Sequence, residues 1–452
     1  MKRVISSRIA GAAIGMTLAA AAGLAHGPRP AAKQPAGAAT QQMAATENPT
    51  PAERQIAAAR TQIESRPASF RAHNALALGL ARRARETADG DYYRLAEEAL
   101  AESRRLMPGN LEAERLEIWL LLGQHDFRRA LEAATELNRR IPDDLLTYAF
   151  LADAHVELGD YGAAEEAVQW MLDLRPGNVP GLTRGAYLRE IYGDIPGAVD
   201  WMRMALQRTH PAEVEDRAWL LTQVAHLELG RGELDRAEAA LDGARALFPD
   251  YHYALAELAD LRSAQGRREE AVELRRRHTE LAPHPENYFY LAEALVRAGR
   301  AGEAQPVFSR FERLALAETD GVDNANGELV RYYLEHADRP VEALEIAERE
   351  IARRRDVKTL EVYARALLAN GRVAEAGAAI DEALAPGGDA AELLFHAAEI
   401  ASADARYDEA LSLCERSLVR NRHSTVAGQV RRLMAETRAG GQAMRPAAST
   451  GG

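Results

Sequence analysis

The residues that most often carry chemistry are few and scattered in this 452-residue chain. The single cysteine, Cys414, excludes a disulfide within the chain, and its register among apolar residues predicts a buried structural thiol. The twelve histidines include no HExxH pattern and no pair four residues apart. His278 and His284, on either side of Pro283, also lack the spacing of a metal site. We therefore expect no bound metal.

Sequence motifs of activated nucleophiles and of glycine-rich phosphate-binding loops are also missing. Glycines stand singly at turns, and no G-x-S-x-G stretch occurs. Paired carboxylates such as Glu97-Glu98 and Glu165-Glu166 are what an acidic helix surface produces by chance. We expect no catalytic residues, no cofactor and no enzymatic activity. The net charge of −12 disfavours binding to nucleic acid or to anionic lipid.

The strongest local pattern is a pair of amphipathic helices within residues 145–178. Tyr148 and Leu151-Ala152 share one face of the first helix, and Gly159-Asp160-Tyr161 interrupts the helical spacing. Ala164 then lies on the apolar face of a second helix, and Pro176 ends the segment. These residues at these offsets resemble the tetratricopeptide repeat (TPR), a helix–turn–helix unit of 34 residues.

The same residue types recur along most of the chain. Alanines 130, 164 and 198, aspartates 126, 160 and 194, and prolines 108, 142 and 176 each repeat with a step of 34. Steps of 39 from Ala198 to Ala237 and from Ala304 to Ala343 indicate insertions near residues 209–216 and 315–324. Units are expected to start near residues 69, 111, 145, 179, 218, 252, 285, 324, 357 and 391.

The resemblance implies an all-α fold, a right-handed α-solenoid of about ten TPR units spanning residues 51–438. A helix from Pro51 should pack on the first unit, whose own first helix is elongated over residues 69–87. Residues 424–438 should form a capping helix, because an open solenoid end would expose its apolar stripe.

The two ends of the chain do not share this pattern. Lys2, Arg3 and Arg8 precede the uncharged residues 9–25, which predicts a signal peptide over residues 1–25. The uncharged run is shorter than the ~20 apolar residues that a membrane span requires, and an uncleaved anchor is the alternative. Residues 26–50 are rich in Ala, Pro and Gln and predict a disordered linker, and residues 439–452 predict a disordered tail. We expect a periplasmic protein, or one anchored to the inner membrane and facing the periplasm.

In proteins similar to this one, the first helix of each unit lines a concave groove that receives a peptide. Side chains at positions 2, 5, 9, 12 and 13 of a unit share that face. On this chain they predict the following partner-binding residues: Trp119, Asp153, Tyr187, Trp219, Tyr253, Asp260, Phe289, Glu293, Tyr332, Glu335, Phe395 and Glu399. Aromatic side chains make good anchors and the acids would select a basic partner, although the aromatics could instead fill the space between units.

These features favour a non-catalytic scaffold or adaptor in bacterial envelope assembly, secretion or export. Its partner would be a protein or peptide, basic or rich in aromatic residues, and not a nucleic acid. The alternative is a structural spacer or assembly subunit of an envelope complex, tethered by an uncleaved N-terminal anchor and using its ends or its convex face.

Overall fold

Residues 49–444 are described by a computed structural model, and all of the regular structure in this range is α-helical. The predicted signal peptide, most of the predicted linker and the end of the predicted tail lie outside it. The helices are α1 (Pro51–Ser65), α2 (Phe70–Thr87), α3 (Asp91–Leu106), α4 (Leu111–Gly123), α5 (Phe127–Arg140), α6 (Leu145–Leu158), α7 (Tyr161–Leu174), α8 (Val179–Ile191), α9 (Ile195–Arg208), α10 (Val214–Gly230), α11 (Leu234–Leu247), α12 (His252–Ala264), α13 (Arg268–Leu281), α14 (Pro285–Arg297), α15 (Ala301–Leu316), α16 (Asn326–Glu335), α17 (Pro340–Ile351), α18 (Val357–Ala369), α19 (Val373–Leu384), α20 (Ala391–Ala403), α21 (Tyr407–Arg420) and α22 (Ala427–Met444).

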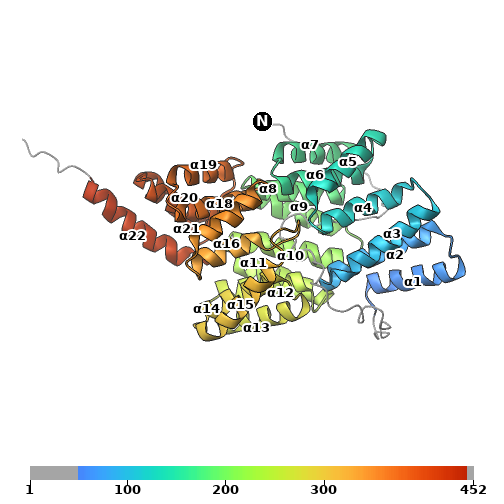
Figure 1. Cartoon of the computed structure of the whole chain (residues 1–452), viewed down its shortest axis with the longest axis horizontal. Coiled ribbons are helices and arrows are strands. Elements are labelled where there is room, and N and C mark those ends of the chain that lie inside the picture. The colour runs from blue at the N-terminus through green and yellow to red at the C-terminus, as the bar shows by residue number, and fades with distance from the viewer. Residues whose placement is uncertain (1–48, 445–452) are drawn as a thin grey trace, which may run out of the picture.

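The helices form consecutive antiparallel pairs that we number as units, from unit 1 (α2 and α3) to unit 10 (α20 and α21) (Figure 1). The starts expected from the sequence agree with the starts of these pairs to within a few residues. The connections before α10 and α16 contain the two expected insertions. α1 packs on α2, and α22 packs on α21 as the expected capping helix. The predicted α-solenoid is confirmed.

Local chemistry explains where the helices begin and end. Asp126, Asp160 and Asp194 each precede the second helix of a unit, and each carboxylate accepts a hydrogen bond from the first turn of that helix. Gly159 ends α6 with a φ of 87°, in the left-handed region where glycine is strain-free. Ala164 is completely buried, which lets the two helices of its unit approach closely.

The apolar core runs along the solenoid between neighbouring units. It divides into four clusters that follow one another in chain order, and each joins only helices that are close in sequence. Cys414 is completely buried in the last of them, as expected for a structural thiol. Within residues 49–444, no helix combines the length and apolar character needed to cross a membrane.

The even-numbered helices form the inner side of the curve. Pairs of them from neighbouring units contact each other, namely α2–α4, α4–α6, α6–α8, α10–α12, α14–α16, α16–α18 and α18–α20. The odd-numbered helices pack mainly on the even-numbered helices beside them. Side chains on the concave surface therefore come from the even-numbered helices.

The solenoid completes one turn after about six units, and successive turns touch. The turn within each of units 1 to 5 meets the start of the unit six positions later, or of α22. The contacts are Ala88 with His284, His125 with Asp323, Tyr161 with Val357, Gly193 with Gly387 and Arg420, and Leu229 with Asn421. We call this line of contacts the seam.

Candidate functional site

A row of solvent-accessible polar side chains on the even-numbered helices contains more carboxylates than basic groups. We define the inner row as Glu157, Tyr187, Glu190, His226, Glu257, Tyr290, Glu328, Arg331, Glu335, Glu361, Arg365, Glu392, His396 and Glu399. These residues extend from α6 to α20, and none of them is fully buried. Carboxylates outnumber basic groups, so the row favours a cationic ligand over an anionic one.

The best-defined part of the inner row is a histidine between two carboxylates. The His226 ring contacts Glu190 through Nε2 at 3.0 Å and Glu257 through Nδ1 at 3.3 Å, which joins α8, α10 and α12. Burial alone would lower the pKa of His226, but Glu257 and Glu190 raise it well above its usual value. Burial would raise the pKa of Glu190, and His226 and Lys358 outweigh it to give a lowered value. The three groups form one charged bridge across three units.

Aromatic and basic side chains surround the next carboxylates. The Tyr290 hydroxyl donates to Glu328 at 3.1 Å, from α14 to α16. The Arg331 guanidinium lies 4.9 Å from the ring centroid of Phe289 and 6.0 Å from that of Tyr290. Arg365 donates to Glu335 at 2.8 Å, which extends the network to α18.

The end of the row in unit 10 holds carboxylates with little compensation. His396 contacts Glu361 at 2.6 Å, and this partner lowers the pKa of Glu361 despite the opposing effect of burial. Glu392 and Glu399 form no ion pair with any residue in the described range. Burial raises the pKa of both. A cation placed beside Glu392 and Glu399 would supply the charge that they lack.

The structure corrects the predicted groove at seven of its twelve positions. Trp119, Asp153, Trp219, Phe289, Glu293, Tyr332 and Phe395 are buried, with exposed fractions of 0 to 6%. The five aromatic residues belong to the apolar clusters between units. A partner cannot reach these side chains in this conformation, and the alternative that they fill space between units is the correct one.

A shift of one residue along the helix explains part of this error. Neighbouring residues on an α-helix differ by about 100° around its axis, so one residue separates the inner face from the core. On α14 the inner row contains Tyr290 while Phe289 is buried, and on α20 it contains His396 while Phe395 is buried. Large aromatic side chains gain most by burial, which favours the core at these positions.

Asp153 is buried for an electrostatic reason. Its carboxylate accepts from the Arg184 guanidinium at 2.5 Å, and both side chains are 2 to 3% exposed. Arg184 also donates to the carbonyls of Ala149 and Pro180. The pair joins α6 to α8. Arg184 is therefore already the counter-ion of the carboxylate that was expected to bind a basic partner.

Five predicted residues keep contact with solvent. Tyr187, Glu335 and Glu399 belong to the inner row, whereas Asp260 pairs with Arg275 at 2.5 Å on the edge of unit 6. Tyr253 is half-buried, and burial raises its pKa to about 12. Contact of any of these residues with a partner remains a prediction.

Sequence reasoning missed most members of the inner row. A signal was available, because the bridging carboxylates and histidines recur at separations of 31, 36 and 35 residues. These separations are close to one unit. The place of His226 on the first helix of its unit follows from the repeat, where a packed or groove-lining histidine is expected, but its two carboxylate partners are revealed only by the fold.

One group of side chains has the composition of a metal site. Ligand atoms of Glu293, Glu335 and His336 lie within 4.8 Å of one another. Glu293 is paired with Arg297 and His336, and Glu335 with Arg365. Arginines therefore occupy the carboxylates that a cation would need, and we assign no metal to this group.

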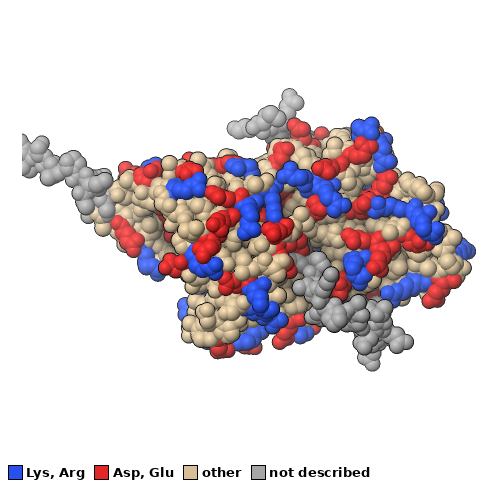
Figure 2. All heavy atoms as spheres, viewed as in Figure 1, with Lys and Arg blue, Asp and Glu red and all other residues tan. Residues whose placement is uncertain are grey.

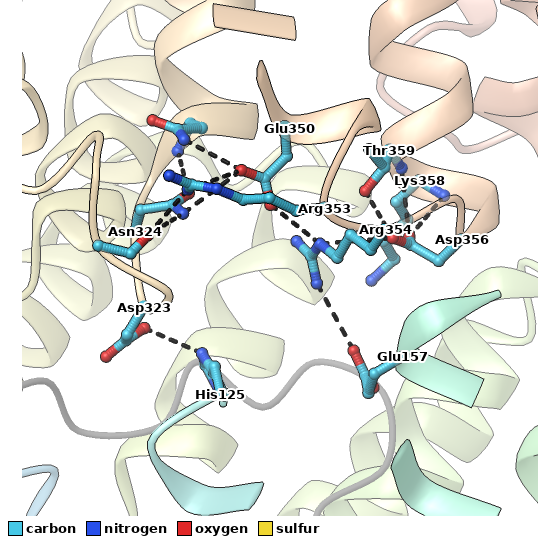
Figure 3. A network of polar contacts seen from close by, with 12 residues as sticks. His125, Glu157, Asp323, Asn324, Glu350, Arg353, Arg354, Asp356, Lys358 and Thr359 are labelled. Carbon is cyan, nitrogen blue, oxygen red and sulfur yellow. Dashed lines mark hydrogen bonds and ion pairs between the residues drawn. The ribbon is translucent and has the colours of Figure 1, made fainter. Parts of the chain in front are cut away.

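The seam brings the second turn of the solenoid against the beginning of the inner row. Glu157 lies 3.7 Å from Arg354, and His125 lies 2.9 Å from Asp323, as Figure 3 shows. Asp356 contributes to the raised pKa of Tyr187, after burial and the nearer carboxylates, so it too faces the row. On the face of the molecule shown in Figure 2, acidic and basic side chains are intermixed.

No protein-family model matches the chain, and no curated protein is detectably similar in sequence. Solved structures resemble it in fold. A human IFIT1 dimer with PPP-AAAA aligns with a TM-score of 0.47 and 15% identity, over 81% of this chain and 93% of that one. PilW, a widely conserved type IV pilus biogenesis factor, aligns with a TM-score of 0.38 and 17% identity, over 48% and 94%. A tetratricopeptide repeat protein from Parabacteroides merdae aligns with a TM-score of 0.35 and 17% identity, over 57% and 98%.

These similarities are too low to transfer a function, and the assignment rests on the repeat itself. Ten helix pairs follow one another at a step close to 34 residues, with an alanine at each close approach and a capping helix at the end. The chain is a TPR-type α-solenoid.

Proposed function

We propose that this protein is a non-catalytic scaffold that binds a basic, extended segment of a partner protein along its inner row. The observation that carries the proposal is the line of solvent-accessible carboxylates on successive even-numbered helices. It ends at Glu392 and Glu399, which form no ion pair within the described range and whose pKa values are raised by burial in spite of the nearby His396. Lysine and arginine side chains of a partner would add positive charge beside them, and Tyr187 and Tyr290 offer aromatic faces to such side chains.

The same row opposes nucleic acid as a partner. A phosphate backbone would be repelled by the carboxylates of unit 10 and by Glu257. The basic N-terminal stretch followed by an uncharged run supports a location in the bacterial envelope, with export through a signal peptide. The proposed setting is envelope assembly, secretion or export.

The proposal is tested with a labelled extended peptide of alternating lysine and alanine, and with its glutamate–alanine counterpart, by fluorescence anisotropy. The basic peptide should bind and the acidic one should not. Glu392→Gln together with Glu399→Gln should weaken binding about five- to tenfold, the effect of roughly 1 kcal/mol from two partly screened charges. Higher salt should weaken it further.

The matched control carries the same chemical change on the outer surface. Glu166 on α7 and Glu345 on α17 are exposed, so Glu166→Gln with Glu345→Gln removes two charges from odd-numbered helices. This variant should bind like the wild type. Equal loss in both double variants would show that only net charge matters, and would contradict binding along the inner row.

A further inference from the structure

The seam differs from every other interface of the solenoid because it is polar. Within the described range, none of the four apolar clusters joins a unit to the unit six positions farther along the chain. The two turns are held by hydrogen bonds and ion pairs instead. Neighbouring units are therefore joined by apolar burial, whereas successive turns are joined by weaker contacts that compete with water.

The seam is most enclosed at unit 1, which we call the tight end, and its other contacts are partly buried. At the tight end Arg85 of unit 1 also pairs with Glu215 of unit 5, within the first turn, at 2.9 Å, and both side chains are nearly buried. His252 donates from Nε2 to the Arg85 carbonyl at 2.8 Å, and His284 donates to the Ala88 carbonyl at 2.7 Å. Because a carbonyl can only accept, both rings carry a proton on Nε2.

Farther along, the charged contacts are less enclosed. His125 and Asp323 share a part-buried hydrogen bond at 2.9 Å, and Glu157 with Arg354 is a partly exposed ion pair, of a kind that contributes little and is screened by salt. The Arg128 guanidinium donates to the carbonyl of Arg353 at 3.0 Å in an exposed position. Figure 3 shows this stretch, where loops of the second turn reach across to the first.

The connection of residues 317–325 supplies one of these seam contacts. It contains Asp323 and lies between α15 and α16, which contact each other far less than other neighbouring helices do. Even so, Phe308 and Phe311 of α15 pack on Tyr332 of α16, so any movement of the second turn has to bend the solenoid over several units rather than at this connection. The tight end at Arg85 would act as the hinge.

We propose that the seam is a gate to the inner row, which opens between units 2 to 5 and units 8 to 10 to admit a chain segment sideways and then recloses. The identity of the occupant, a basic extended segment, rests on the proposed function. The opening of the seam does not, because it is a motion of the free protein. Opening the seam would uncover Glu157 and Glu190, beside which the second turn now lies.

The motion is tested by small-angle X-ray scattering of the free protein against ionic strength. The radius of gyration should increase with salt while the helical signal in circular dichroism stays constant, because screening weakens the polar seam whereas apolar burial still holds neighbouring units together. A radius of gyration that is unchanged up to molar salt would overturn the gate. A loss of helix that accompanies expansion would overturn it as well, because unfolding rather than opening would explain the change.

Access is tested by locking the seam. His125→Cys with Asp323→Cys places two thiols across it, and a short reducible bis-thiol reagent joins them, while the native Cys414 is completely buried. The control lock joins neighbouring units of one turn, with Glu269→Cys and Arg300→Cys in place of an ion pair at 3.0 Å. The seam lock should slow association of the lysine–alanine peptide at least tenfold, reduction should restore it, and the control lock should leave it unchanged.

The two proposals fail separately. If the unlocked protein does not bind the peptide, the proposed function is wrong, and the gate is then judged by scattering alone. If the peptide binds equally fast to the seam-locked and the unlocked protein, the inner row is reached without opening and the gate is overturned, while the proposed function stands.

Discussion

Removal of the Asp153 carboxylate should destabilise the solenoid between units 3 and 4. Among the described residues, this carboxylate is the only acidic partner of the Arg184 guanidinium, at 2.5 Å, and both side chains are buried. Asp153→Ala would leave Arg184 charged and enclosed, with only the carbonyls of Ala149 and Pro180 to accept from it. The buried cation then loses its counter-ion but cannot reach water.

The expected cost follows from the desolvation of a charge. Breaking a buried ion pair by removing one partner costs about 3–5 kcal/mol. Replacing both partners by apolar residues of similar size, as in Asp153→Leu with Arg184→Met, is expected to cost far less, because no charge remains buried. The single and the double variant therefore separate the penalty of an unpaired charge from the loss of packing.

Hydrogen exchange with mass spectrometry is the suitable assay, because a solenoid loses structure locally and a single global midpoint would conceal the effect. Peptides from α6 and α8 should lose protection in Asp153→Ala by roughly 100- to 3,000-fold, at a factor of ten per 1.4 kcal/mol. Peptides from α18 and α20 should change little. Full protection of α6 and α8 in Asp153→Ala, together with weaker binding of the basic peptide, would refute the structural role of the buried pair. It would indicate instead that Asp153 contacts the partner.

The remaining predictions concern burial, pH and the seam. Trp219→Ala should destabilise the protein by about 3–5 kcal/mol in urea unfolding, because Trp219 is 2% exposed within its cluster. The raised pKa of His226 gives stability that is complete below about pH 6.5 and is lost as the pH rises through the folded value, so the cost of His226→Gln, measured by calorimetry, should shrink between pH 6 and pH 9. Burial lowers the pKa of His252 to about 4, so the wild type should lose stability as the pH falls from about 6.5 towards 4, and His252→Gln should remove this part of the acid sensitivity. Gly159→Ala should cost clearly more than Gly266→Ala in thermal unfolding, because both residues have positive φ but a Cβ at Gly159 would meet the Arg355 carbonyl at 2.5 Å across the seam, whereas none of the described atoms lies within 4 Å at Gly266.

The helices and their pairing could be predicted because their signals are local. The carboxylates of Asp126 and Asp160, the turn at Gly159 and the buried Ala164 each act within a few residues of their own position. A capping helix could also be expected from the need to cover an apolar end, and α22 covers it. Because the sequence repeats at a step close to 34 residues, the same signals recur in successive units and support one another.

The residues of the inner face were harder to predict because they depend on the angular position of each side chain around the helix axis, which a repeat pattern does not fix to within one residue. One residue decides whether Phe289 or Tyr290 meets solvent, and both are plausible anchors by composition. The seam was beyond prediction for a related reason. The contact of His125 with Asp323 joins residues 198 apart, and it exists only because small rotations between six successive units add up to a full turn. No single unit contains that information.

Binding of a basic segment along the even-numbered helices can be followed by hydrogen exchange with and without saturating lysine–alanine peptide. Exchange should become slower in α8, α10, α12, α18 and α20, with little change in α7, α17 and α19. Protection confined to the odd-numbered helices, or to α1 and α22 at the two ends, would contradict it.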